Sequence, residues 1–145
     1  MYKKILVPTD GTPLSEGVIA AAIELARVIR GSQILGLSVI VPISASPFEG
    51  MSPATAKEHE KHMDSHANRY VGLLKTAADA AGVPCEVLVT KGASPAEEIV
   101  RVAKDYQCDC IFMASHGRKG LNRLFLGSET QKVLAQATVP VLVHK

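Results

Sequence analysis

One stretch of the sequence decides the fold: Cys110-Ile111-Phe112-Met113-Ala114-Ser115-His116-Gly117. Its first five residues are apolar and suit a buried strand, and the small and polar residues that follow suit a loop. From Ser128 onward the apolar residues recur with the period of a helix. A strand that leads through a loop into a helix is the repeating unit of a parallel α/β sheet.

The same unit recurs along the chain. Apolar runs alternate with longer segments of helical period, and the runs lie at Lys4–Pro8, Ile34–Val41, Cys85–Thr90, Cys110–Ala114 and Val139–Val143. Five strands and four helices are therefore expected, in the α/β class, as a doubly wound parallel sheet with helices on both faces. The proline within the last run cannot donate to a strand ladder, so that run is expected at an edge of the sheet.

Capping signals mark the predicted helix starts. Thr12-Pro13 and Ser94-Pro95-Ala96-Glu97 each place a hydroxyl before a proline at the first helical position, and Ser128-Glu129-Thr130-Gln131 repeats the capping-box pattern. The second helix is predicted over Thr55–Ala81. The stretch Pro42–Pro53 before it is rich in proline and serine and is interpreted as a mobile loop.

Composition restricts the class of protein. The 145 residues fit one domain, expected over residues 1–145, with an aliphatic core because only 4% are aromatic. A net charge of +2 gives no bulk attraction to nucleic acid or anionic lipid, and no apolar run approaches the roughly 20 residues of a membrane span. Three cysteines, an odd number, do not indicate a disulfide framework. We expect a cytoplasmic protein whose partners are neither nucleic acids nor membranes.

Two predicted strand ends carry residues suited to a ligand at the carboxyl edge of the sheet. Thr9-Asp10-Gly11-Thr12 follows the first strand with one carboxylate and two hydroxyls. The loop Ala114–Ser128 follows the fourth, and its glycines permit positive φ and close approach of the backbone to an anion. The helix start at Ser128 adds free N–H groups and a positive dipole end. This loop predicts phosphate binding; the alternative is that its glycines only make turns and Ser128 only caps a helix.

Charge near this loop supports the phosphate prediction, and the side chains concerned are His116, Arg118, Lys119 and Arg123.

Other ligand classes fit less well. The chain contains neither Gly-x-Gly-x-x-Gly nor Gly-x-x-x-x-Gly-Lys-Ser/Thr, which argues against dinucleotide and P-loop sites. A phosphorylated receiver needs an aspartate after the third strand, where Val89-Thr90-Lys91-Gly92 stands. A flavin carrier needs aromatic side chains, and none is expected near the two loops.

Catalytic and metal sites are also weakly indicated. Ser115 and His116 are adjacent, so they are not expected to face each other as nucleophile and base. His62 and His66 lie four apart on a predicted helix and could share a transition metal. The charged residues between and before them favour a solvated helix face instead.

The frame Gly-x2-Gly-x9-Gly-Ser/Thr provides a resemblance to a known family. The frame is matched by Ala114-Ser115-His116-Gly117, then the nine residues Arg118–Leu126, and then Gly127-Ser128. Ala114 stands in place of the first glycine. In this frame the chain resembles the nucleotide-binding members of the universal stress protein family. The resemblance covers the whole chain, including Ser94-Pro95-Ala96 and the terminal Val139–Val143. It implies a Rossmann-like sheet of the adenine nucleotide alpha-hydrolase-like type, in strand order 3-2-1-4-5.

The resemblance also implies a ligand, ATP, with Mg²⁺ held through its phosphates. Adenine would lie against Val39 and beside Pro8, and ribose and phosphates along Ala114–Gly120. Asp10 would face the ribose or the metal ion, unless it is only a turn residue. The implied site residues, none of them catalytic, are Pro8, Thr9, Asp10, Val39, Met113, Ala114, Ser115, His116, Gly117, Arg118, Lys119, Gly120, Gly127, Ser128, Glu129 and Thr130.

The predicted activity is that of a switch. Nucleotide occupancy would order the loop Gly117–Gly127 and bias partner contacts, with a homodimer expected across the edge strand Val139–Val143. Two alternatives stay open: a family member that binds no nucleotide and acts through dimer or partner contacts, and a slow Mg²⁺-dependent ATPase.

Overall fold

A computed structural model describes residues 1–42, 52–117 and 125–145. Its elements, in chain order, are β1 (Lys4–Pro8), α1 (Pro13–Val28), β2 (Gln33–Ile40), α2 (Pro53–Ala80), β3 (Cys85–Lys91), α3 (Pro95–Asp105), β4 (Cys110–Ala114), α4 (Ser128–Gln136) and β5 (Val141–His144). Strands and helices alternate throughout, as the apolar runs predict.

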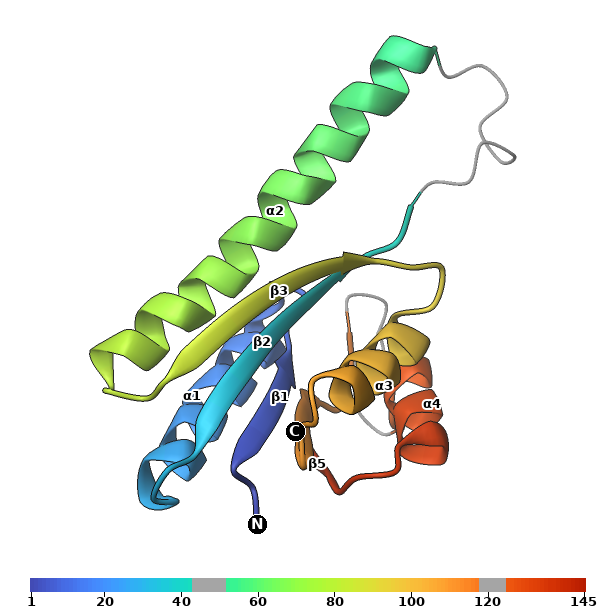
Figure 1. The fold of residues 1–145 in the computed structure, drawn as a ribbon. Helices are drawn as coiled ribbons and strands as arrows, with labels where there is room; N and C mark the ends of the chain where they lie inside the picture. The colour runs from blue at the N-terminus through green and yellow to red at the C-terminus, as the bar shows by residue number, and fades with distance from the viewer. Residues whose placement is uncertain (43–51, 118–124) are drawn as a thin grey trace.

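The strands form one parallel sheet in the order β3-β2-β1-β4-β5 (Figure 1). The strand order implied by the resemblance is confirmed. The chain runs outward from β1 to β3 and then returns across β1 to β4 and β5. The connections on either side of β1 therefore diverge, which creates a switch point between β1 and β4.

Helices cover both faces of the sheet. In β1, Ile5 and Val7 pack on the face covered by α1 and α2, and Leu6 packs on the face covered by α3 and α4. All three side chains are fully buried. This alternation follows from the two-residue period of a strand, and it produces the aliphatic core that the composition predicts.

Two predicted helix caps are confirmed. The Thr12 hydroxyl accepts a hydrogen bond from the Ser15 N–H at 3.3 Å, and the Ser94 hydroxyl accepts one from the Glu97 N–H at 3.4 Å. In both helices a proline occupies the first turn, where its missing donor costs nothing. These starts are fixed locally, which is why the sequence predicts them.

Several predicted boundaries differ from the structure by one residue, and two starts differ by two residues. The helix α2 begins at Pro53 rather than Thr55, so Pro53 belongs to the helix and not to the preceding loop. Residues 43–51 of that predicted loop lie outside the described residues. The strand β5 begins at Val141, so Pro140 precedes the ladder, and its carbonyl accepts the Ile111 N–H at 2.9 Å. The prediction that the last strand lies at an edge is confirmed.

The long helix α2 packs on the sheet only through its second half. Its buried residues are Ala67, Val71, Leu74 and Ala78, and the residues before His62 are exposed. Leu74 fits against Gly36 in β2, where a Cβ would lie 3.0 Å from Leu74 Cδ2. The first half of α2 extends beyond the sheet (Figure 1). Within the described part of the chain, no helix is long and apolar enough to cross a membrane.

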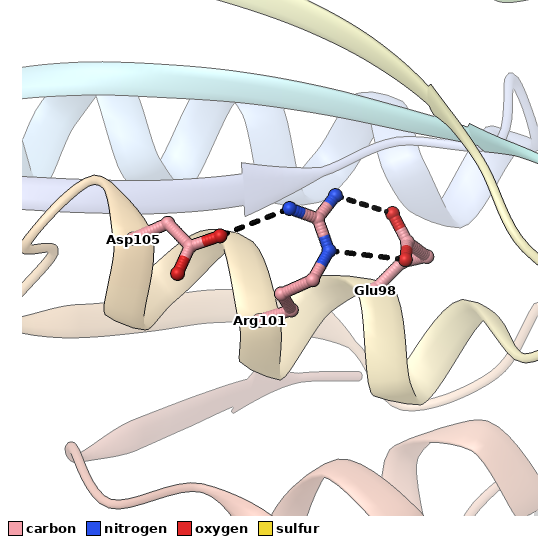
Figure 2. A network of polar contacts seen from close by, with 3 residues as sticks. All are labelled: Glu98, Arg101 and Asp105. Atoms are coloured by element: carbon pink, nitrogen blue, oxygen red, sulfur yellow. Dashed lines mark hydrogen bonds and ion pairs between the residues drawn. The ribbon is translucent and has the colours of Figure 1, made fainter.

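The outer face of α3 carries an ion-pair network (Figure 2). Arg101 donates to both carboxylate oxygens of Glu98, at 3.1 and 2.7 Å, and to Asp105 at 2.9 Å. The Arg101 guanidinium lowers the pKa of the Glu98 carboxyl, against the opposing effect of burial. Because the Arg101 side chain is 50% exposed, the network contributes little to stability.

Candidate functional site

A cavity of about 500 Å³ lies at the carboxyl edge of the sheet, over the ends of β1, β2 and β4. Most residues predicted for the site line it: Pro8, Thr9, Asp10, Val39, Met113, Ala114, His116, Gly117, Glu129 and Thr130. Ser115, Gly127 and Ser128 are not part of its lining. Arg118, Lys119, Gly120 and Arg123 lie outside the described residues.

Asp10 follows β1 and lines this cavity. Its Oδ1 accepts the Thr12 N–H at 3.1 Å, the Thr12 hydroxyl at 2.7 Å and the Ser15 hydroxyl at 2.7 Å. These bonds fix the turn into α1, so the turn role predicted for Asp10 is confirmed. Its Oδ2 faces Gly117, where an added Cβ would lie 3.2 Å away. One carboxylate thus holds the turn after β1 and faces the loop after β4.

Buried polar groups join the two ends of the loop after β4. The Gly127 N–H donates to the Ser115 carbonyl at 2.8 Å. The Thr130 hydroxyl lies 3.0 Å from the Ala114 carbonyl and 3.1 Å from the Ser115 carbonyl, which share its proton. Thr130 is 2% exposed, so these bonds are shielded from water. The predicted phosphate contact Thr130 therefore also closes the base of the loop.

The expectation that Ser115 and His116 would not face each other is wrong. The Ser115 Oγ lies 2.9 Å from His116 Nδ1, and His116 Nε2 bonds the Phe125 carbonyl. Because a carbonyl can only accept, Nε2 carries the proton that bonds the Phe125 carbonyl. Ser115 is only 2% exposed. The pair therefore locks the loop ends and does not present a nucleophile to the cavity.

The positive φ predicted for the loop glycines is wrong for the two that the structure describes, while their predicted approach to an anion stays a prediction. Neither Gly117 nor Gly127 has a positive φ. A Cβ on Gly127 would lie 3.2 Å from His116 Cα and 3.2 Å from the Ser115 carbonyl oxygen. Glycine is needed there because the two ends of the loop pack backbone against backbone.

The N-terminus of α4 has no side-chain cap. Gly127 occupies the cap position and Ser128 is the first helical residue, so the capping box predicted at Ser128 is wrong. Among the described residues no side chain caps the first-turn N–H groups, and the positive dipole end there favours an anion. The Glu129 side chain points to α3 instead: Oε2 accepts the Ala96 N–H at 2.9 Å, and Oε1 lies 3.0 Å from Lys132 Nζ. These partners compensate the Glu129 charge.

A wall of the cavity that the sequence did not predict comes from α2. Met63, His66, Ala67 and Tyr70 line the cavity, at the spacing of one helix face. The Tyr70 ring rests on Gly11, where a Cβ would lie 2.1 Å from Tyr70 Cε1. The expectation that no aromatic side chain lies near the loops is therefore wrong. The helical spacing indicates a shared face, but only the packing places that face over the end of β1.

Metal ligands do not converge in the described part of the chain. Residues 1–42, 52–117 and 125–145 contain no group of three His, Cys, Asp or Glu side chains placed to hold a metal ion. His59 and His62 are exposed, and His66 stacks on Tyr70 with a ring-centroid separation of 6.1 Å. A metal ion at this site would therefore have to be held partly by its ligand.

The sheet order and the cavity over the switch point place this chain among the Rossmann-like α/β proteins. The sequence profile of the universal stress protein family matches residues 1–145, and the chain belongs to that family. Universal stress protein MJ0531 of Methanocaldococcus jannaschii is 32% identical over 146 residues, which cover 100% of this chain and 83% of that protein.

Solved structures share the fold. One is described as the structure-based assignment of the biochemical function of hypothetical protein MJ0577; it matches with a TM-score of 0.86 and 29% identity, over 99% of this chain and 95% of that one. A universal stress protein in complex with cAMP matches with a TM-score of 0.73 and 20% identity, over 99% and 97% of the two chains. Another, from Archaeoglobus fulgidus in complex with dAMP, has a TM-score of 0.66 and 20% identity, over 99% and 98%. At these identities the last two likenesses establish the fold alone.

Proposed function

We propose that this protein binds ATP in the cavity at the carboxyl edge of the sheet and acts as a nucleotide-responsive switch of the cytoplasm. The proposal takes residues 1–145 as one universal stress protein domain. The observation that carries it is the placement along one cavity of the apolar end of β2, the Asp10 carboxylate and the start of α4. The volume, about 500 Å³, lies within the roughly 300–1,000 Å³ usual for small-ligand sites.

Adenine belongs at the β2 end in this proposal. Val39 of β2 and Pro8 of the adjacent β1 give that part of the cavity an apolar lining suited to a flat heterocycle. Fold relatives solved in complex with cAMP and dAMP support an adenine nucleotide as the class of ligand. Because β2, β1 and β4 are consecutive in the sheet, the ribose would lie at the end of β1 and the phosphates near the end of β4.

The phosphates belong at the start of α4. Its first-turn amides have no side-chain cap, and the Glu129 charge is directed to α3, which removes the repulsion expected from a carboxylate beside a triphosphate. Gly117 leaves the space facing Asp10 open. Arg118, Lys119 and Gly120 are further phosphate contacts in this proposal, and only the family frame supports them.

Mg²⁺ would enter with the phosphates. This cation is usually held by one or two carboxylates together with phosphate oxygens and water, and Asp10 is the carboxylate in reach. The carboxylate lines the cavity, and its Oδ2 lies on the side of Gly117, so Asp10 is the residue assigned to the metal. The metal would neutralise phosphate charge, while the chain itself orients the nucleotide.

Calorimetric titration with ATP and Mg²⁺ tests the proposal. The native chain should release or absorb heat on binding, and Gly117→Val should abolish binding because its side chain enters the cavity beside Asp10. The matched glycine control is Gly72→Ala on α2, where an added Cβ meets nothing within 4 Å. Native protein that gives neither heat nor a thermal shift at millimolar ATP would overturn the proposal and favour the branch of the family that binds no nucleotide.

The switch part of the proposal concerns β5. This strand forms one edge of the sheet, and its four residues are half-buried. The Ser115 N–H at the start of the loop donates to the His144 carbonyl of β5 at 2.8 Å. We place a homodimer across this edge and expect ATP to bias its formation through that connection. Light scattering that finds only monomer, with and without ATP, would count against it.

A further inference from the structure

Tyr70 separates two cavities. It lines the large cavity at the carboxyl edge and also a smaller one of about 240 Å³ between α1 and α2. The smaller cavity is bounded by Glu16, Ile19, Arg69 and Leu73. Thr9 and Ser15 line both cavities as well, so Tyr70 is the aromatic member of the boundary between them.

The ring of Tyr70 is held in place by its neighbours. It lies against the backbone of Gly11, whose φ of +75° and missing Cβ allow the contact. Two other residues of α2 contact the same ring. The His66 ring stacks on Tyr70 with an interplanar angle of 24°, and the Arg69 guanidinium lies 5.6 Å from the Tyr70 ring centroid. A ring fixed before binding loses little conformational freedom when a ligand packs on it.

The position of Tyr70 in the fold indicates which part of a nucleotide it meets. Gly11 follows Asp10 at the end of β1, and β1 lies between β2 and β4 in the sheet. The helix α2 covers the face shared with α1, whereas α4 covers the opposite face. Tyr70 therefore lies between the proposed adenine and ribose positions, on the far side of the sheet from the proposed phosphate position.

We propose that Tyr70 is a specificity-determining residue of this site, whose ring packs on the nucleoside part of the bound nucleotide. The inference rests on the nucleotide function proposed above. A flat aromatic ring binds heterocycles through their π-faces and sugars through their apolar faces, and the part of a tyrosine that donates to a phosphate is its hydroxyl rather than its ring. Tyr70 accordingly sets the affinity for the nucleoside and leaves the affinity for the phosphates unchanged.

The test compares ATP with inorganic tripolyphosphate, each titrated with Mg²⁺ into native protein and variants. Tyr70→Leu should weaken ATP binding about tenfold, within the range known for loss of one base–aromatic stack. It should bind tripolyphosphate as the native chain does. Tyr70→Phe keeps the ring and should recover most of the lost ATP affinity. The control on the same helix is Asn68→Ala, an exposed residue whose side chain donates to the Asp64 carbonyl at 2.8 Å and does not line either cavity.

The outcomes separate this inference from the nucleotide function. Native protein that binds ATP, together with Tyr70→Leu that binds it equally well, overturns the role of Tyr70 alone. Equal losses for ATP and tripolyphosphate also overturn it, because they indicate that the Gly11 turn has been displaced. Native protein that binds no ATP overturns both. Thermal unfolding of each variant verifies that the chain is folded before titration.

Discussion

Replacing Glu129 by alanine tests whether its carboxylate supports α3 or a ligand. In the structure Oε2 accepts the Ala96 N–H at 2.9 Å, in the first turn of α3. A hydrogen bond to a charged group contributes about 1.5–3 kcal/mol. The side chain is 38% exposed, so we take the lower part of that range. The Lys132 pair is half exposed and adds at most about 0.5 kcal/mol. The expected loss is about 1.5–2 kcal/mol of unfolding free energy, or roughly 5–7 °C in Tm.

Denaturant unfolding followed by circular dichroism measures this loss, with two matched controls. Glu129→Gln keeps an acceptor for the Ala96 N–H and should lose less than half as much. Lys132→Met removes only the ion pair and should change the stability by no more than about 0.5 kcal/mol. Calorimetry with ATP supplies the second readout, and the alanine variant should still bind. If Glu129→Ala is as stable as the native chain but loses ATP, the carboxylate serves the ligand and the reasoning fails.

Three further predictions concern stability and reactivity. Thr130→Val should cost about 1–3 kcal/mol, because two buried carbonyls lose their hydroxyl donor, while Thr130→Ser should lose clearly less; equal losses would contradict this. Gly127→Ala should destabilise the protein through its 3.2 Å backbone contacts, whereas Gly72→Ala should stabilise α2 by up to about 1 kcal/mol, and effects of the same sign would speak against the reasoning. Burial raises the pKa of Cys108 and Cys110 from 9.0 to about 11, so native protein should react with a disulfide reagent far more slowly than unfolded protein at neutral pH. Because the folded pKa is the higher one, the associated stability is present below pH 9.0 and declines toward about 11; a flat unfolding profile across that window would refute it.

The sequence predicts features that depend on neighbouring residues. The strand β1 is an apolar run whose Ile5, Leu6 and Val7 are all fully buried, and the caps at Thr12 and Ser94 lie within a few residues of the amides they bond. Period, burial and capping are local physics, so they appear in the sequence itself. The strand order came from the family frame and not from local physics.

The features that the sequence missed depend on contacts between distant segments. Tyr70 meets Gly11 because α2 packs beside α1, and no local pattern specifies that packing. The choice of Gly127 over Ser128 as the cap follows from the contact of Gly127 with Ser115. The repulsion expected from Glu129 is relieved by an amide 33 positions away in the chain. These three features have a long-range origin, whereas the contact between the adjacent Ser115 and His116 is local.

The central position of β1 has a consequence for synthesis of the chain. Its first neighbour, β2, follows directly after α1, but its other neighbour, β4, is among the later strands to be made. Asp109, which bonds the N–H groups of Lys3 and Lys4 at 2.9 and 3.0 Å, stands 106 and 105 positions after them. Until β4 leaves the ribosome, the apolar strand β1 has one unpaired edge. This edge can pair with a second nascent chain. Only the arrival of Asp109 and β4 closes this edge, so the earliest segment of the protein stays open to pairing with another chain through most of its synthesis.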